Sequence, residues 1–277
     1  MSALENSIAE YAKTALERRK TWYSSVAGDY HQVRPRYPRE IIRQVIEITG
    51  LSDRSNVLEI GCGPGTATLD FAKSGCSMTC LEPNPDFYRF ASENCQPYPR
   101  VKILNTSLEE WPIEVGAFSA VIAASSFHWI PKEIAYPKSA DALEENGFLI
   151  LLWNTQLQPK YEIYQRLAAV YQQYAPSLDR YEDNATRAGI FREFGEAIEN
   201  SGRFQKAIYG QIESTVTYSI EDYITLLKTY SPYMKLEERS REDLFDGIRD
   251  CLDREFEKNL ELSFISAFQI ARKSEND

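Results

Sequence analysis

The sequence predicts an α/β fold in which a mostly parallel sheet is covered by helices on both faces. Between residues 50 and 154, short apolar runs alternate with segments of helical periodicity. The apolar runs are continuous rather than alternating, as expected for strands that are buried on both faces. The five predicted strands are Asn56–Ile60, Ser77–Leu81, Val101–Leu104, Phe118–Ala124 and residues 148–153.

Helical segments precede and separate these strands. In Arg39–Thr49 the apolar residues 41, 42, 45, 46 and 48 share one helix face, and Gly50 marks the end. Further helices are predicted over residues 4–20, 66–74, 85–94 and 132–143. The proline-flanked residues 34–38 should be extended or turned, because proline disfavours helix in the residue before it.

The pattern changes after residue 154. Residues 155–203 and 219–260 are predicted to form a helical cap, with Ser219 as a helix N-cap. Residues 204–218 and 261–273 alternate like closing strands. We therefore expect a single domain, residues 1–277, made of an N-terminal segment (1–38), a core (39–154), the cap and the closing strands.

Composition restricts the possible partners and the compartment. Lys and Arg number 31 against 41 Asp and Glu, a net charge of −10 that disfavours binding to nucleic acid. The longest strongly apolar run, residues 148–153, is far short of the about 20 residues that a membrane span needs. No secretion signal is recognisable, and five cysteines without a C-x-x-C pair fit reduced thiols in a cytoplasm. With two histidines, no metal site is expected.

A glycine-rich turn follows the first predicted strand. Gly61, Gly63 and Gly65 lie directly after Asn56–Ile60 and open the next helix. Glycine lets a ligand approach the backbone closely, and ligands of open α/β sheets bind beyond the carboxyl ends of the strands. Glu82 ends the next strand, 17 residues after Gly65, where a carboxylate can bind ribose hydroxyls.

A nicotinamide or flavin dinucleotide is the main alternative ligand for such a turn. Its fingerprint places the third glycine one residue later than Gly65, where this chain has Thr66. Glu59 also puts a carboxylate directly before the turn. A carboxylate is unfavourable next to a pyrophosphate and favourable next to cationic ammonium and sulfonium groups. The electrostatics therefore favour S-adenosylmethionine.

Two motifs carry a family resemblance. The run V-L-E-I-G-C-G-P-G-T at residues 57–66 and the run L-E-P-N at residues 81–84 resemble the first and the ribose-binding motifs of the class I methyltransferases. The resemblance implies a Rossmann-like, seven-stranded, mostly parallel sheet whose last strand is antiparallel, with S-adenosylmethionine as cofactor. It places Glu59 and Gly61 by the methionine end and Glu82 on the ribose. The residues implied to bind the cofactor here are Glu59, Gly61, Cys62, Gly63, Gly65, Glu82 and Pro83.

Two further segments extend the resemblance. After the third strand the family usually has an acid that contacts the adenine; this chain has Ser107, so we expect the contact from Ser107 or from the backbone of Leu108. Residues 26–30 and 34–38 resemble a segment that closes over the cofactor in small-molecule methyltransferases. Tyr30 and Arg34 are candidates to cover the sulfonium and to pair with the cofactor carboxylate. A packed tyrosine and a solvated arginine are the alternative.

The end of the fourth predicted strand is where methyl group and acceptor should meet. Ser125 is expected at the cofactor, and Phe127, His128, Trp129 and Trp153 at the acceptor. Methyl transfer from a sulfonium is a direct displacement in which positioning supplies most of the acceleration. A base helps only if the acceptor is a hydroxyl or a thiol. His128 is therefore a candidate catalytic base, an orienting donor or a packed residue.

The expected function is methyl transfer to a small molecule, with release of S-adenosylhomocysteine. The segment S-F-H-W-I at residues 126–130 lacks the N-P-P-Y motif of methyltransferases that act on nucleobases or glutamine. It resembles, loosely, a small-molecule group that includes trans-aconitate methyltransferases. Tyrosines of the cap either fill helix interfaces or line an acceptor pocket. A cofactor-binding protein without catalysis is the rival hypothesis, and a nicotinamide-dependent oxidoreductase is disfavoured.

Overall fold

The structure, a computed structural model, describes residues 12, 14–255 and 259–275. Most of the helix predicted over residues 4–20 lies outside these residues, and its described end is α2, Leu16–Thr21. Residues 256–258 of the predicted cap likewise fall outside them, and its last two residues, 259–260, begin a strand instead of ending a helix. None of the described helices is both long enough and apolar enough to span a lipid bilayer.

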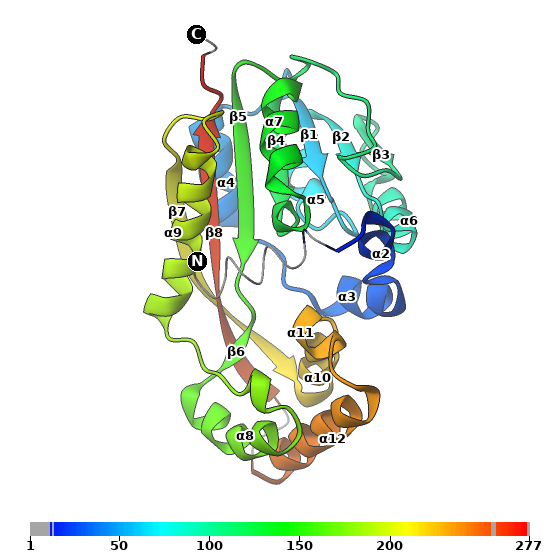
Figure 1. Ribbon diagram of the computed structural model, residues 1–277, viewed down its shortest axis with the longest axis vertical. Coiled ribbons are helices and arrows are strands. Elements are labelled where there is room, and N and C mark those ends of the chain that lie inside the picture. Colours follow the sequence, from blue (N-terminus) through cyan, green and yellow to red (C-terminus); the bar gives the residue numbers. More distant parts are fainter. Residues whose placement is uncertain (1–11, 13, 256–258, 276–277) are drawn as a thin grey trace.

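One sheet of eight strands forms the centre of the molecule (Figure 1). The strands from β3 to β5 pair in parallel in the order β3-β2-β1-β4-β5, and β8 runs antiparallel to β5. The short strand β6 and the long strand β7 pair antiparallel with β8. This confirms the predicted mostly parallel sheet whose last strand is antiparallel. The strands are β1 Asn56–Ile60, β2 Ser77–Leu81, β3 Val101–Leu104, β4 Phe118–Ala124, β5 Leu143–Asn154, β6 Gln158–Pro159, β7 Ile208–Ser219 and β8 Asn259–Arg272.

The first four strands have the predicted bounds, whereas β5 starts five residues earlier than predicted. Leu143 already pairs with Phe118, and the register then shifts before Phe148 pairs with Ala120. Asn146 takes a positive φ of 65° inside this irregular stretch. Asn146 thus lies in an irregular stretch of β5, and the strand pairing with β4 continues on both sides of it.

Helices cover both faces of the sheet. On one face, Ile41 and Val45 of α4 pack against alternate strand residues that include Val57 and Ile150. Helix α4 ends at Gly50, whose φ is +69°, as the sequence predicts. The helices on this face are α4 Arg39–Thr49, α5 Thr68–Ala72 and α6 Pro85–Cys95.

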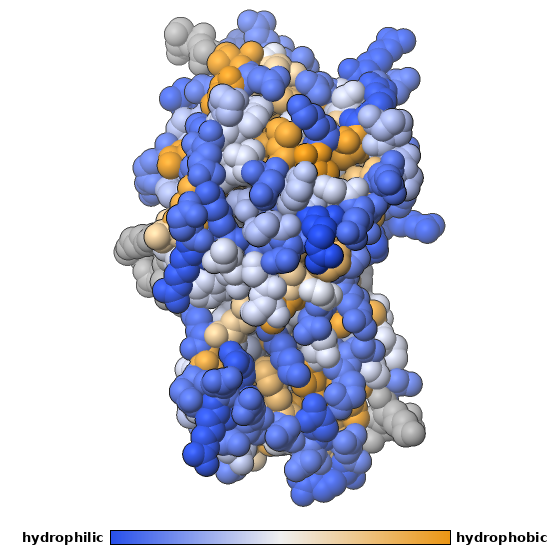
Figure 2. All heavy atoms as spheres, turned by 90° about the vertical axis from the view of Figure 1, so that its right-hand side faces the viewer, coloured by the Kyte–Doolittle hydropathy of each residue, from blue (hydrophilic) through white to orange (hydrophobic). Residues whose placement is uncertain are grey.

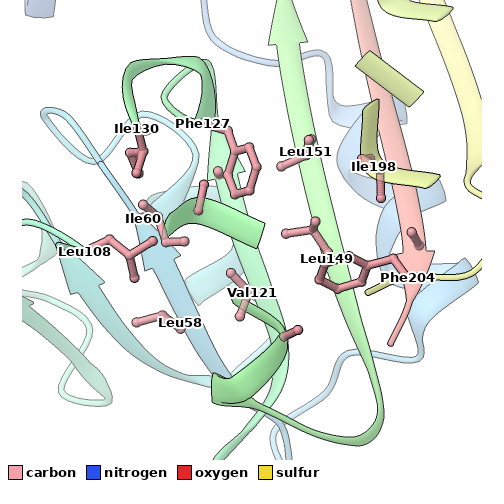
Figure 3. Packing of buried hydrophobic residues seen from close by; sticks show 14 of the residues in the cluster. Leu58, Ile60, Leu108, Val121, Phe127, Ile130, Leu149, Leu151, Ile198 and Phe204 are labelled. Carbon is pink, nitrogen blue, oxygen red and sulfur yellow. The ribbon is translucent and has the colours of Figure 1, made fainter. Parts of the chain in front are cut away.

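The opposite face is covered by α7 (Lys132–Ala142) and α9 (Asn184–Asn200). Figure 3 shows the cluster of apolar side chains between them and the sheet. The same cluster buries Leu108, from the loop after β3, and Phe127, from the short 3-10 turn η2 after β4. These two segments are thus anchored by apolar packing where they leave the sheet. The labelled members are Leu58, Ile60, Leu108, Val121, Phe127, Ile130, Leu149, Leu151, Ile198 and Phe204.

A second apolar cluster forms the cap, at the far end of β7 and β8 (Figure 1). Ser219 is the N-cap of its helix α10, as predicted, and its hydroxyl accepts a hydrogen bond from Asp222 N at 3.0 Å. Leu260 and Phe264 of β8 belong to this cluster, so the closing strands extend into the cap. The cap contains α8 Tyr161–Tyr174, η3 Pro176–Leu178, α10 Ile220–Lys228, α11 Ser231–Met234 and α12 Glu238–Glu255.

The N-terminal segment bridges the core and the cap. It comprises α2, η1 (Ser24–Val26) and α3 (Ala27–Val33), which lie between the two in Figure 1. The hydroxyls of Tyr23 and Ser231 are 2.8 Å apart, and Tyr218 of the cap donates to the carbonyl of Val33. The side of the molecule that carries this segment is covered mostly by hydrophilic residues (Figure 2).

Candidate functional site

The glycine-rich turn connects β1 to α5 at the carboxyl edge of the sheet. Gly61 and Gly63 have φ of +65° and +58°, which favours glycine at both positions. The backbone N–H groups of Gly61 and Cys62 both donate to the carbonyl of Leu81. A side chain on Gly61 would come within 2.7 Å of the Cβ atom of Ser126, whereas Gly63 faces open space. The turn therefore presents bare backbone at Gly63.

Glu82 lies beside this turn with its carboxylate held in a fixed orientation. One oxygen accepts a hydrogen bond from Gly63 N at 2.7 Å and the other from Asn84 N at 2.8 Å. Burial raises the pKa of Glu82 to about 7 although both N–H donors act in the opposite direction. Each oxygen keeps a lone pair for a further donor, such as a ligand hydroxyl.

Glu59 is fully buried behind the turn. One carboxylate oxygen accepts from Thr68 Oγ1 at 2.6 Å and from Cys80 Sγ at 3.6 Å. The other oxygen has no hydrogen-bond partner within the part of the chain that the structure describes. Burial raises the pKa of this carboxyl to about 7. Buried polar atoms are usually hydrogen-bonded, so this carboxylate oxygen can accept a further hydrogen bond.

A cavity of about 660 Å³ extends from the glycine turn across the carboxyl ends of the central strands. It is within the range of about 300–1,000 Å³ usual for ligand pockets. Glu59, Gly65 and Phe127 are not among its lining residues. Gly65 instead packs near Cys95, and Phe127 is buried in the core beside Tyr136. The predicted site residues that line it are Tyr30, Arg34, Gly61, Cys62, Gly63, Glu82, Pro83, Ser107, Leu108, Ser125, His128, Trp129 and Trp153.

Arg34 places a positive charge in the cavity wall. Its guanidinium lies 4.6 Å from the ring centre of Tyr30 and 4.1 Å from that of Tyr230. It donates to the side chain and to the carbonyl of Thr229, at 2.9 and 2.7 Å. No carboxylate of the described residues contacts it, so a ligand carboxylate would find this cation without an acidic partner.

The loop after β3 lines the cavity through Ser107, Leu108 and Glu109. Ser107 donates to the carboxylate of Glu110 and accepts from its backbone N–H, so its hydroxyl is engaged within the loop. Lys138 of α7 holds the loop in place. Its ammonium donates to the carbonyls of Leu108, Glu109 and Trp111 at 2.8, 2.9 and 3.1 Å. A ligand that reaches this loop therefore meets a segment with little freedom to move.

An aromatic wall stands at the ends of β4 and β5. Trp153 stacks on Phe194 of α9 with ring centres 4.0 Å apart, and its indole N–H donates to Gln269 at 2.6 Å. His128 lies 5.7 Å from the rings of both Trp129 and Trp153. Burial lowers the pKa of His128 to about 4, although one side of its ring borders the cavity. The imidazole is therefore neutral at pH 7.

Ser125 has a positive φ of 56°, an unfavourable conformation for a non-glycine residue. The hydroxyl of Tyr37 lies 2.8 Å from that of Ser125, and Tyr37 lines the cavity although it is largely buried. The sequence did not single out Tyr37 as a site residue, although it stands within the proline-flanked segment. Tyr23 and Phe87 were also missed as lining residues, whereas Tyr230 is a cap tyrosine, for which lining an acceptor pocket was one of the alternatives. Their sequence surroundings give no signal, because they reach the cavity only through tertiary packing.

Comparison with known proteins identifies the family. A family model described as a methyltransferase domain matches residues 57–147, which contain the glycine turn and Glu82. An uncharacterized methyltransferase of Mycobacterium tuberculosis is 30% identical over 48% of this chain and 52% of its own length. This chain thus spans about half the length of the mycobacterial relative. The comparisons support a class I S-adenosylmethionine-dependent methyltransferase family for this chain, and residues 57–147 match its methyltransferase domain.

Two longer matches agree with this assignment. An uncharacterized methyltransferase-like protein of Schizosaccharomyces pombe is 26% identical over 80% of this chain and 82% of its own length. A solved structure from Anaeromyxobacter dehalogenans, described as a candidate type II methyltransferase, superposes with a TM-score of 0.62. The superposition covers 86% of this chain and 97% of that structure at 19% sequence identity, which shows that the two share a fold.

The residues of this site fit S-adenosylmethionine, the cofactor that the resemblance implies. Gly63 exposes bare backbone to the cavity, and the Glu82 carboxylate beside it can accept bonds from ribose hydroxyls. The carboxylate of Glu82 suits a cationic ligand and Arg34 suits its carboxylate, whereas Glu59 lies behind the turn and does not line the cavity. Arg34 and the loop of Ser107 line the same cavity.

Proposed function

We propose that this protein transfers a methyl group from S-adenosylmethionine to a small-molecule acceptor. The observation that carries this proposal is the continuity of the cavity. It joins the Gly63–Glu82 cradle to the aromatic wall at the end of β4, so a cofactor and an acceptor can occupy it together. Family membership supports the same reaction.

The bound cofactor would supply a methyl group activated by the positive charge of a sulfonium. Glu82 then binds the ribose hydroxyls, and the backbone at Gly63 lies against the cofactor. Tyr30 contributes a ring face toward the cation, since aromatic faces attract positive charge. Arg34, held between Tyr30 and Tyr230, pairs with the cofactor carboxylate. These contacts position the cofactor and exclude water from the reacting centre.

His128 serves the acceptor rather than the cofactor in this proposal. With a pKa of about 4 its imidazole is neutral at physiological pH and can accept a proton from a hydroxyl or a thiol. So low a pKa makes it a weak base, better suited to orienting the acceptor and taking its proton during the transfer. An acceptor that arrives as a carboxylate needs no base, and His128 would then only orient it.

The acceptor is proposed to be of medium size and partly apolar. Trp153, Phe194 and Ile190 give this half of the cavity apolar walls, while Glu182 and Arg180 add charge near the cap. Helix α9 closes the same half over Trp153 through the Trp153–Phe194 stack. The cavity is walled by the core, the N-terminal segment and the cap, which suits a small molecule better than a nucleic acid.

Calorimetric titration tests cofactor binding. Heat with S-adenosylmethionine and S-adenosylhomocysteine but not with NADH is expected, with strong weakening in Glu82→Ala. Binding of NADH alone would refute the proposal. Methyl transfer is then tested against a panel of carboxylic acids, phenols, thiols and amines. Formation of S-adenosylhomocysteine that depends on an acceptor supports an enzyme; binding without turnover on any acceptor favours the non-catalytic rival.

A further inference from the structure

Arg19 of α2 connects three segments that are distant in sequence. Its Nη2 atom forms an ion pair with Glu109 at 2.7 Å, and its Nη1 atom donates to the carbonyl of Trp129 at 2.5 Å. Its Nε atom donates to the carbonyl of Thr14 at 3.0 Å. The side chains of Arg19 and Glu109 are only 9% and 13% exposed. One guanidinium thus has all three of its nitrogens engaged in a largely buried setting.

The two distant segments that Arg19 joins both line the cavity. Glu109 belongs to the loop after β3 that also carries Ser107 and Leu108. Trp129 belongs to η2 (Phe127–Trp129), the turn that carries His128. One end of each segment is anchored in the same apolar cluster, through Leu108 and Phe127. Each segment also contacts the guanidinium of Arg19, the loop through the carboxylate of Glu109 and η2 through the carbonyl of Trp129.

The chemistry of this contact requires arginine. A planar guanidinium can hold a carboxylate and a carbonyl in fixed relative positions, whereas an ammonium is a single point charge. Removing the cation would leave the carboxylate of Glu109 buried without its partner, which is unfavourable. Lys138 would still hold the carbonyls of the loop from the other side. The loop would thus remain near its place but lose its connection to η2.

We propose that Arg19 is a positioning residue that couples cofactor binding at the loop of Ser107–Glu109 to the placement of the turn that carries His128. A cofactor seated on this loop fixes Glu109, Glu109 fixes the guanidinium, and the guanidinium fixes the carbonyl of Trp129. The acceptor wall is thereby ordered when the cofactor is in place. This inference rests on the proposed function, because it assumes that the cofactor contacts the loop.

The test compares Arg19→Met, Arg19→Lys and Lys20→Met with the unmodified protein, using S-adenosylhomocysteine as the probe. Methionine retains much of the apolar stem and removes the charge. Lysine keeps the charge, but it replaces the two nitrogens that bind Trp129 and Glu109 by a single nitrogen on a shorter stem, so we expect it to keep the ion pair with Glu109 and to lose the bond to Trp129. Lys20 is the matched control: it is the next residue on α2 and pairs with Glu110, which is 44% exposed, so its loss should change affinity by less than about twofold.

Binding and amide hydrogen exchange are measured for each protein. We expect Arg19→Met to weaken binding about 10- to 100-fold, because a buried charge-assisted contact is lost. In the unmodified protein, saturating S-adenosylhomocysteine should slow exchange both at residues 107–111 and at Trp129 and Ile130, whose amides are hydrogen-bonded within the turn. In Arg19→Met and Arg19→Lys, the ligand should still slow exchange at 107–111 but no longer at Trp129 and Ile130.

The outcomes separate this inference from the proposed function. Loss of protection at the turn in both Arg19 variants, with Lys20→Met unchanged, supports the coupling. Ligand-induced protection of the turn that persists in Arg19→Lys overturns it, as does a Lys20→Met variant that loses protection equally. If Arg19→Met fails to fold, Arg19→Lys carries the test alone. Failure of the unmodified protein to bind S-adenosylhomocysteine would instead refute the proposed function.

Discussion

Binding of S-adenosylhomocysteine should release protons, because Glu82 changes its protonation when ribose hydroxyls donate to it. Burial raises the pKa of Glu82 from 4.5 to about 7 in the free protein, so about half of the molecules carry a proton there at pH 7. Hydroxyl donors favour the ionised carboxylate and lower its pKa. If the bound form is fully ionised, about 0.5 proton is released for each ligand bound at pH 7.

The same reasoning sets the pH dependence of affinity. With a pKa of about 7, the ionised fraction of Glu82 falls from about 0.9 at pH 8 to about 0.1 at pH 6. The dissociation constant should therefore rise about tenfold over this interval as pH falls. Glu59 also has a pKa raised to about 7 by burial, and any change in its protonation would add to the effect.

Calorimetry in buffers of different ionisation enthalpy measures the released protons directly. Glu82→Gln cannot titrate and should lose most of the release, while Glu59→Gln should retain the part that belongs to Glu82. Glutamine has one acceptor oxygen for the two backbone donors, so it should also lower the free energy of unfolding by about 1–3 kcal/mol. A binding enthalpy independent of the buffer, with equal affinity at pH 6 and pH 8, would refute this reasoning.

Four further predictions concern His128, Gly61 and Tyr37. His128→Ala should cut turnover at least about tenfold on a hydroxyl or thiol acceptor, with unchanged affinity for S-adenosylhomocysteine; equal turnover would contradict a role in proton transfer. Because the pKa of His128 is about 4, its contribution to the rate should be constant from pH 6 to pH 9. The turnover of the unmodified protein and that of His128→Ala should therefore change with pH in the same way over this range. Gly61→Ala should lower stability by at least about 1–3 kcal/mol in urea unfolding, because its Cβ atom would lie 2.7 Å from that of Ser126 at a positive φ; Gly28→Ala, which meets nothing within 4 Å, is the control. Tyr37→Phe should cost about 1 kcal/mol in the same measurement, and no change would show that its bond to Ser125 contributes nothing.

Local signals made the central sheet predictable. Continuous apolar runs gave β1 to β4 their bounds, and Gly50 gave α4 its end. The start of β5 was not predictable, because Leu143 enters the strand through a pairing with Phe118 that leaves no local pattern. The helical cap was predictable in outline from periodicity, but not the fact that β7 and β8 extend into its apolar core.

The site residues were likewise predictable only in part. Gly63 and Glu82 stand in short motifs, so the sequence could place them at one turn. Glu59 was expected by the cofactor, and its side chain lies behind the turn instead, because it points into the interior toward Thr68. Arg19 and Tyr23 could not have been found, since each reaches the cavity through contacts with residues far away in sequence. The neutral state of His128 also depends on burial that the sequence does not reveal.

The pairing of β7 with β8 restricts how the molecule can open. The ladder runs without a register shift over twelve pairs, from Ile208 with Ile270 in the core to Ser219 with Asn259 in the cap. A hinge between cap and core would have to bend or break this ladder, so the two should move and unfold as one rigid unit. Ligand exchange must then depend on the elements that are attached by side chains alone. The N-terminal segment is one such element beside the cavity, held by contacts such as Tyr23 with Ser231, and helix α9 is another, held by Phe194 on Trp153.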